Sequence, residues 1–277
     1  MQNAGIGVLG LNWRYLAFDV YPERLPEAIE GARAMHYLGL NLTVPHKILA
    51  MDMVDILDES ASTWGAVNTI RFEGKHSDGH WTPLHQWSEP PLHVRSHGFN
   101  TDAEAIVRAL REDLGIELGG RRVLLLGAGG AGRTAALKLA SEGIKEIFLV
   151  NRTRDKAAAL GSEIRATWPA VNVSLDYPGG EVDLVLNATS LGLKENDPLP
   201  FDESRFGVDR AKAVYDMIYR PAETSLLRTA KLAGLRTSNG ISMLLYQGTQ
   251  ALEIWSEQPA PLEVMRQALL NNVYGSL

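Results

Sequence analysis

The chain has 277 residues, a formal net charge of −6 and 45% hydrophobic residues, values typical of a soluble globular protein with one or two domains. The negative charge gives no electrostatic reason to expect nucleic acid or an anionic membrane as a partner. Cysteine is absent from the sequence, which excludes disulfides, thiolate metal sites and a cysteine nucleophile. No apolar run approaches the roughly 20 residues of a membrane span, and no signal-peptide pattern opens the sequence, so we expect a cytoplasmic protein.

The first part of the chain alternates short strand candidates with helix candidates. Strands are predicted at residues 13–18 (WRYLAF), 39–44 (GLNLTV) and 65–70 (GAVNTI). Helices are predicted at residues 23–35 and 46–57. This alternation indicates an α/β unit.

A second α/β series follows, with strands predicted at residues 121–126, 146–150, 182–188 and 211–217. Two helices, predicted at residues 241–255 and 262–274, close the sequence. We therefore predict an α/β fold with a Rossmann-type nucleotide domain at residues 104–240. A discontinuous α/β substrate domain is expected to comprise residues 1–103 and to be completed by residues 241–277, with a cleft between the two domains.

The segment VLLLGAGGAGRTAALKLA, residues 123–140, carries the most specific local pattern. An apolar run precedes glycines in G-x-G-x-x-G spacing, and a strong helix former follows them. Such glycines permit a tight turn and a close approach of the backbone to a pyrophosphate at a helix N-terminus. We predict dinucleotide binding by Gly127, Ala128, Gly129, Gly130, Ala131 and Gly132.

The end of the next predicted strand indicates which dinucleotide binds. An NAD site normally places an acidic residue there, whereas a 2′-phosphate calls for cations. This chain has Asn151, Arg152 and Thr153 after the strand, followed by Arg154 and Lys156. The prediction is NADP. The alternative is that these charges only solvate the first turn of a helix, although that turn usually favours acids.

Eight motifs, in order, are similar to those of the shikimate dehydrogenase family: NLTVPHK, GAVNT, NTD, GAGGAGRT, NRT, NATS, YDMIY and NGISMLLYQ. The resemblance covers nearly the whole chain. It implies a reversible, NADP-dependent reduction of 3-dehydroshikimate to shikimate, a step of chorismate and aromatic amino acid biosynthesis.

The resemblance also implies a catalytic pair. Lys47 matches the family's catalytic lysine, and the aspartate of NTD, Asp102, matches its partner. Hydride delivery to a ketone leaves negative charge developing on oxygen, and a cation or proton donor aimed at that oxygen stabilises the transition state. A carboxylate would orient the ammonium and compensate its burial. The alternative is that Lys47 merely begins an exposed helix after Pro45.

By the same similarity, polar side chains would surround a substrate that carries several hydroxyls and a carboxylate. A ligand without these groups would leave the polar side chains unpaired and would bind more weakly. The expected substrate-binding residues are Asn41, Thr43, Lys47, Asn68, Asp102, Tyr219 and Gln247. Further cofactor contacts are expected from Asn187, Ala188, Thr189 and Ser190, which follow an apolar strand, and from Met217 and Gly240. For each of these residues the alternative is an ordinary turn or packing role.

Two features depart from the family. Its members begin with a strand and a Ser-x-Ser pair that grips the substrate carboxylate, but this sequence begins at MQNAGIGVLG, and we expect a misplaced start rather than a real truncation. Residues 74–98 interrupt the family pattern and hold His76, His80, His85, His93 and His97. Because the histidine spacing fits no compact ligand motif, we expect a surface loop without bound metal, which could act as a lid.

Other functions stay open. A quinate-preferring relative would share most of these residues, and a ligand- and nucleotide-binding module without turnover would explain missing serines, although Lys47 and Asp102 speak against it. A glutamyl-tRNA reductase-like enzyme needs a cysteine, which this chain lacks. The expected partners are small molecules, with no nucleic acid, membrane or metal, and the chain is expected to be a monomer or a homodimer.

Overall fold

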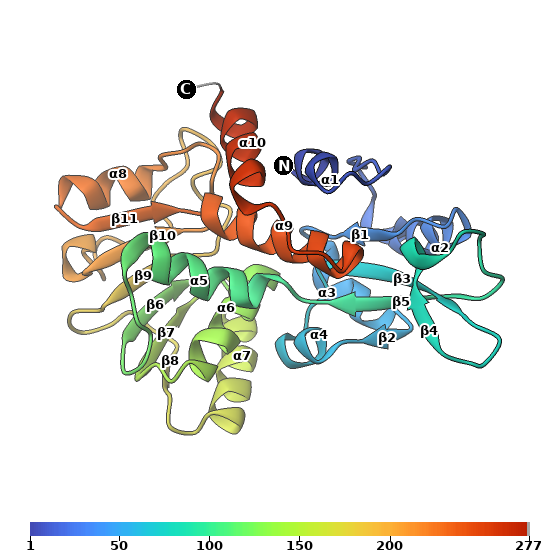
Figure 1. Ribbon diagram of the computed structural model, residues 1–277. Helices are drawn as coiled ribbons and strands as arrows, with labels where there is room; N and C mark the ends of the chain where they lie inside the picture. The colour runs from blue at the N-terminus through green and yellow to red at the C-terminus, as the bar shows by residue number, and fades with distance from the viewer. Residues whose placement is uncertain (276–277) are drawn as a thin grey trace. The chain divides into compact units, whose positions relative to one another are not determined.

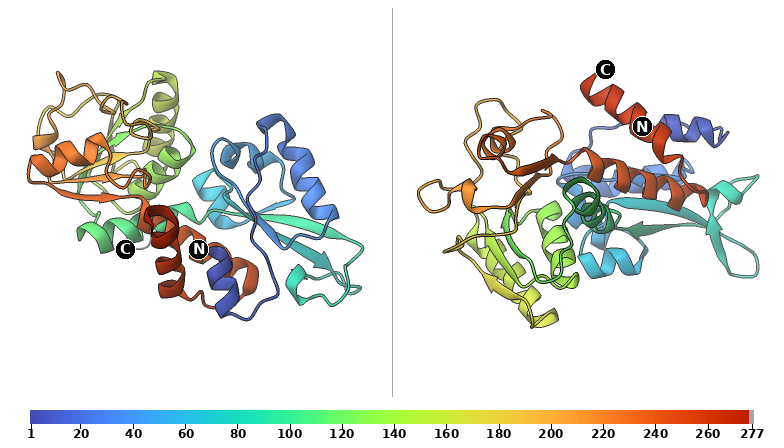
Figure 2. Two further views of the ribbon diagram at one scale, coloured as in Figure 1. Left: turned by 90° about the horizontal axis from the view of Figure 1, so that it is seen from above. Right: turned by 60° about the vertical axis from the view of Figure 1, so that its left-hand side comes forward.

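The structure is a computed structural model that describes residues 1–275, so the last two residues of the predicted 241–277 segment lie outside it. The chain divides into two compact units, which can be followed by colour in Figure 1 and Figure 2. Unit 1 comprises residues 1–101 together with the C-terminal residues from Leu245 onward, and unit 2 comprises Asp102–Leu244. Each unit has its own sheet and its own apolar core.

The sheet of unit 1 has the order β1-β3-β5-β2, with β4 paired to β3 outside this path. β1 and β5 both run antiparallel to β3, whereas β2 runs parallel to β5. The strands are β1 (Gly39–Asn41), β2 (Ile56–Leu57), β3 (Thr69–Lys75), β4 (Trp81–Pro83) and β5 (Val94–Phe99). β3 is the best-covered strand, because every residue from Thr69 to Gly74 except Arg71 is buried.

Unit 1 also contains several helices. They are α1 (Gln2–Val8), α2 (Leu25–Ala34), α3 (His46–Leu49), α4 (Glu59–Trp64), most of α9 (Ile241–Ser256) and α10 (Leu262–Tyr274), with 3-10 helices at Pro22–Arg24, Ala50–Asp52 and Leu84–Gln86. The sequence sets the ends of α4: the Asp58 side chain accepts a hydrogen bond from Ser60 N at 2.8 Å, and Gly65 ends the helix in the left-handed region. Leu25 and Ile29 of α2 pack with Ile70 and Phe72 of β3 in the core.

The sheet of unit 2 is parallel throughout, in the order β11-β10-β9-β6-β7-β8. Read from β8, this is the strand order of the doubly wound dinucleotide-binding fold. Its strands are β6 (Arg122–Leu126), β7 (Glu146–Val150), β8 (Asn172–Ser174), β9 (Leu184–Asn187), β10 (Ala213–Asp216) and β11 (Arg236–Asn239). The central strands are continuous apolar runs, as expected for a sheet covered on both faces.

Helices lie on both faces of this sheet, and Figure 2 shows α8 on the opposite side from α6 and α7. The helices are α5 (Asp102–Leu114), α6 (Gly130–Ser141), α7 (Arg154–Thr167) and α8 (Ser225–Leu232), with a 3-10 helix at Val208–Arg210. Leu226 and Leu227 of α8 pack with Leu124 and Leu126 of β6. The α/β class and the Rossmann-type unit predicted from the sequence are confirmed.

Three predicted elements are wrong. Residues 13–18 form no strand, and two of their apolar side chains, Leu16 and Phe18, are 64% and 63% exposed. The predicted helix at residues 46–57 ends at Leu49, and its last residues form β2. Residues 74–98 are not a simple surface loop, because they complete β3, form β4 and enter β5, which lies inside the sheet. None of the helices formed by residues 1–275 is long and apolar enough to cross a membrane.

Candidate functional site

In unit 1 the segment NLTVPHK runs from β1 into α3 (Figure 1). Thr43 lies in the turn and is exposed, and its carbonyl accepts a hydrogen bond from His46 N at 2.8 Å. Lys47 is half-buried in α3, and its carbonyl accepts from Val67 N at 2.8 Å. This bond ties the helix that carries Lys47 to the chain that enters β3.

Asn68 is the centre of a buried hydrogen-bond cluster in unit 1. Its side chain is 1% exposed, and its Nδ2 donates to Thr101 Oγ1 at 2.9 Å and to Gln247 Oε1 at 3.4 Å. Its Oδ1 accepts from Thr101 N at 2.9 Å and from Thr69 Oγ1 at 3.2 Å. The structure therefore brings Asn68 and Gln247, two predicted substrate residues far apart in the sequence, into contact.

Asn41 joins the edge of this cluster. Its Nδ2 donates to Thr69 Oγ1 at 3.0 Å and to the Asn68 carbonyl at 3.3 Å. Its Oδ1 accepts from Tyr15 OH at 3.0 Å, and burial raises the pKa of the Tyr15 hydroxyl. The sequence did not predict Tyr15 as part of a site, because its segment read only as a strand.

Asp102 is 2% exposed and begins α5, directly after Thr101 in the chain. Thr101 belongs to the NTD motif but received no role from the sequence, although its Oγ1 also donates to the Gln247 carbonyl at 3.0 Å. Tyr219 follows β10 in unit 2 and is half-buried. Lys47 and Gln247 belong to unit 1, whereas Asp102 and Tyr219 belong to unit 2.

In unit 2 the glycine motif lies between β6 and α6. Gly127 has a φ of +103°, which a residue with a side chain rarely adopts, and its N–H donates to the Val150 carbonyl at 2.8 Å. A Cβ at Gly132 would lie 2.3 Å from the Gly127 carbonyl oxygen, so only glycine fits there. A Cβ at Gly129, the N-cap of α6, would meet nothing within 4 Å. The turn is thus tightly packed at Gly132, whereas the space around Gly129, at the N-terminus of the helix, is open.

The loop after β7 lies beside this turn. Asn151 Oδ1 accepts from Ala128 N at 3.0 Å, and Asn151 Nδ2 donates to the Thr153 carbonyl at 2.7 Å. The three cations that follow, Arg152, Arg154 and Lys156, are exposed, and within the described chain none of them forms an ion pair. Uncompensated cations at this position suit a phosphate rather than a ribose hydroxyl.

Behind the carboxyl ends of β9 and β10 lies a buried polar network that the sequence did not predict. Asn187 Oδ1 accepts from the backbone and the hydroxyl of Thr189 at 3.0 and 2.8 Å, which shapes the turn of the NATS motif. Asn187 Nδ2 donates to Asp216 Oδ1 at 2.9 Å, and the Thr224 hydroxyl donates to Asp216 Oδ2 at 2.7 Å. Burial raises the pKa of Asp216, although these hydrogen bonds act against the rise. Ala188 and Ser190 flank Thr189 in the same turn.

Met217 and Gly240 are in contact. Met217 N donates to the Asn187 carbonyl at 2.9 Å, and a Cβ at Gly240 would lie 2.0 Å from the Met217 carbonyl oxygen. The structure therefore places both residues next to the NATS turn, at the carboxyl edge of the parallel sheet where nucleotides bind in this fold. The glycine turn, the open helix N-terminus and the unpaired cations together fit a dinucleotide with a 2′-phosphate. No cluster of three or more His, Asp or Glu within residues 1–275 could hold a metal ion.

Three family profiles match the sequence. They are described as shikimate dehydrogenase substrate binding domain (residues 1–70), shikimate / quinate 5-dehydrogenase (residues 109–191) and shikimate 5'-dehydrogenase C-terminal domain (residues 240–270). The protein named shikimate dehydrogenase (NADP(+)) of Methanopyrus kandleri is 39% identical, with coverage of 99% of this chain and 90% of that protein.

Solved structures are similar as well. A crystal structure of shikimate dehydrogenase in complex with NADP+ aligns with a TM-score of 0.81 and 34% identity, over 98% of this chain and 89% of that chain. The Thermus thermophilus shikimate 5-dehydrogenase in complex with NADP(H) and shikimate aligns with a TM-score of 0.76 and 32% identity, over 96% of this chain and 91% of that chain. With this identity and coverage, the chain belongs to the shikimate dehydrogenase family.

Proposed function

We propose that the protein is an NADP-dependent shikimate dehydrogenase that reversibly reduces 3-dehydroshikimate to shikimate in the cytoplasm, as a step of aromatic amino acid biosynthesis. The observation that carries the proposal is the 39% identity to the Methanopyrus kandleri enzyme over nearly the whole chain. The local geometry supports it, because the chain carries both a dinucleotide turn in unit 2 and a cluster of substrate-type polar residues in unit 1.

Lys47 and Asp102 are the proposed catalytic pair. Bound NADPH would supply the hydride for the ketone carbon. The Lys47 ammonium would stabilise the developing alkoxide, and it would also hold the proton that the oxygen receives. The Asp102 carboxylate would fix the position of the ammonium and compensate its charge.

Asn68 and Gln247 are proposed to bind ring hydroxyls of the substrate. Their mutual hydrogen bond and the bonds of Asn68 to Thr101 support this role, since they hold the Asn68 amide in one orientation. Asn41, Thr43 and Tyr219 complete the proposed substrate set. A ligand without the matching hydroxyls would leave these polar groups unpaired, and this would select against it.

Unit 2 is proposed to bind NADP, and unit 1 is proposed to bind the substrate. Gly127 to Gly132 would receive the pyrophosphate at the N-terminus of α6. Arg152, Thr153 and Lys156, positioned by Asn151, would receive the 2′-phosphate. Asn187 to Ser190, Met217 and Gly240 would lie against the nicotinamide half of the cofactor.

The test is an assay of purified protein with shikimate and NADP, read at the NADPH absorbance band. NADPH formation is expected, with a higher kcat/KM for NADP than for NAD and for shikimate than for quinate. A sample shown to be folded by circular dichroism that forms no NADPH would overturn the proposal. Faster turnover of quinate would reassign the substrate to the quinate-preferring branch of the family, and equal use of NAD would overturn the cofactor assignment.

A further inference from the structure

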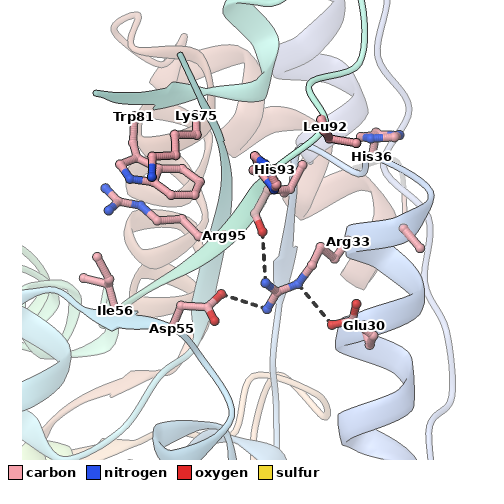
Figure 3. Close-up of a pocket in the computed structure, with 12 residues that line it drawn as sticks. Glu30, Arg33, His36, Asp55, Ile56, Lys75, Trp81, Leu92, His93 and Arg95 are labelled. Carbon is pink, nitrogen blue, oxygen red and sulfur yellow. Dashed lines mark hydrogen bonds and ion pairs between the residues drawn. The ribbon is translucent and has the colours of Figure 1, made fainter. Parts of the chain in front are cut away.

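A pocket with a volume of about 790 Å³ lies within unit 1 (Figure 3), and its lining includes none of the residues assigned above to the substrate or to NADP. We refer to it as the Trp81 pocket. Its lining comes from α2, from the start of β2 and from β3, β4 and β5. The residues that carry the argument are Arg33, Ile56, Lys75, Trp81, Leu92 and Arg95. The volume is that of a pocket for a small organic molecule.

Lys75 provides a positive charge without a carboxylate partner. It ends β3, is exposed, and forms no ion pair with any of the described residues. Its Nζ instead lies 5.7 Å from the centre of the Trp81 ring. An ammonium in this position remains available to an anion that enters the pocket.

Arg95 provides a second, partly compensated charge. Its Nε and Nη2 both lie 2.7 Å from Glu73 Oε2, and its guanidinium carbon lies 4.6 Å from the centre of the Trp81 ring. Nη1 donates no hydrogen bond within residues 1–275. Glu73 also pairs with Arg71 at 2.6 Å, and Arg71 in turn lies 3.8 Å from Glu257, so Arg95 shares its carboxylate with a second guanidinium group.

The other guanidinium of the pocket, that of Arg33, faces two carboxylates. It pairs with Asp55 at 2.7 Å and with Glu30 at 3.1 Å, as the dashed lines in Figure 3 show. Both carboxylates of the pocket are therefore engaged by Arg33, and one negative charge remains in excess beside it. The positive charge that an anionic ligand could meet is at Lys75 and Arg95. Figure 3 shows both side chains beside the Trp81 ring.

Apolar surface lies next to this charge. The indole of Trp81 is half-buried, Ile56 lines the wall, and Leu92 is 90% exposed at the rim. A flat, unsaturated ring could pack against the indole and cover Leu92, and ring stacking favours an aromatic ligand over a saturated one. His36 and His93 also line the pocket and add donors without a fixed charge.

We propose that the Trp81 pocket binds a small aromatic carboxylate. Its carboxylate contacts the Lys75 ammonium and Nη1 of Arg95, and its ring packs against Trp81 and Leu92. The proposal does not depend on the proposed dehydrogenase activity, because it uses none of the residues assigned to that reaction.

The test is titration of the 15N-labelled full chain with benzoate, followed by the indole N–H resonance of Trp81, which the Trp81→Phe variant assigns. We expect a saturable shift of that resonance at concentrations up to roughly 10 mM, a range that fills even a weak site. Cyclohexanecarboxylate should bind about fivefold more weakly, because it keeps the charge and loses the aromatic ring. Benzamide, which keeps the ring and loses the charge, should bind more weakly still.

Lys75→Gln should weaken benzoate binding about tenfold, as expected for loss of one charge-assisted contact. Lys145→Gln, which removes an exposed lysine of unit 2 without an ion pair, is the matched control and should leave binding unchanged. The remaining resonances of each variant report whether it is folded. The proposal would be overturned by a Trp81 resonance that does not move, by equal affinity for the saturated acid, or by equal affinity in the folded Lys75→Gln variant.

Discussion

Asn68 and Thr101 exchange two hydrogen bonds: Asn68 Nδ2 donates to Thr101 Oγ1, and Thr101 N donates to Asn68 Oδ1, both at 2.9 Å. Both residues are almost completely buried. The pair fixes the amide of Asn68 and the backbone that leads directly to Asp102. The same two hydrogen bonds therefore hold Asn68, which is proposed to bind the substrate, and the backbone next to Asp102, which is proposed to be catalytic.

Replacement of Asn68 by alanine should lower both stability and substrate affinity. The change leaves the buried Thr101 N–H without its acceptor, so the free energy of unfolding should fall by about 2 kcal/mol. The KM for shikimate should rise at least about tenfold, because a hydroxyl of the substrate loses its partner. Urea unfolding and steady-state kinetics measure the two effects. Asn172→Ala, at an exposed position, is the control, and equal behaviour of both variants would contradict the role of Asn68.

The glycine turn predicts opposite outcomes for two similar substitutions. Gly129→Ala meets open space, so the protein should stay as stable as the wild type, but the added methyl group should hinder the pyrophosphate and weaken NADP binding about tenfold or more. Gly132→Ala would place Cβ 2.3 Å from the Gly127 carbonyl oxygen and should lower the melting temperature. Thermal unfolding and NADP titration separate the two. Gly179→Ala, also in open space, is the control, and NADP affinity unchanged by Gly129→Ala would exclude this turn as the binding site.

The unpaired cations after β7 predict cofactor selectivity. Arg152→Ala should raise the KM for NADP by about tenfold and leave the KM for NAD nearly unchanged, because only NADP carries the 2′-phosphate. The measurement is kcat/KM for both cofactors, with Lys145→Ala as the control for loss of an exposed positive charge. An equal loss of kcat/KM with NADP and NAD would show that Arg152 does not contact the 2′-phosphate.

Glu73 predicts an acid-sensitive contribution to stability. Burial alone would raise the pKa of this carboxyl, but hydrogen bonds from His97, Arg71 and Arg95 lower it from 4.5 to about 2. A lowered folded-state pKa stabilises the protein above pH 4.5, and this contribution of roughly 3 kcal/mol at most is lost as the pH falls toward 2.

Glu73→Gln should therefore reduce the free energy of unfolding at pH 7 and make it less dependent on pH below pH 4.5. Urea unfolding across this range measures both effects. Glu89→Gln, at an exposed position of the same unit, should change neither. If the free energy of unfolding of Glu73→Gln still depended on pH as steeply as that of the wild type, the acid sensitivity would belong to other groups.

The sequence predicted elements whose signal is local. The apolar run Val123–Leu126 followed by glycines identified β6 and α6, because a strand covered on both faces reads as a continuous apolar run. β8 and β11 were missed because they are short, polar edge strands. β5 was missed because Arg95 and His97 make it look like a loop, whereas both side chains pair with the buried Glu73.

The site follows the same rule. Motifs named the residues of the glycine turn, but Thr101 and Asp216 received no role, because their partners are distant in the sequence. Thr101 contacts Gln247 across 146 residues, and Asp216 contacts Asn187 across 29 residues. The opposite error occurred at residues 13–18, where an apolar pattern typical of a strand led to a wrong prediction. No neighbouring strand among residues 1–275 pairs with this segment, and the side chains of Leu16 and Phe18 remain exposed.

The central claim is that the Lys47 ammonium stabilises the alkoxide formed during reduction. Its most direct test is the single-turnover rate of hydride transfer from shikimate to NADP in Lys47→Met, with Lys145→Met as the control and a deuterated substrate to confirm that the chemical step is observed. The account predicts a fall of about a thousandfold in this rate, because the variant loses both the charge that stabilises the alkoxide and the group that exchanges a proton with it in either direction. A folded Lys47→Met enzyme that transfers hydride at the wild-type rate would contradict it.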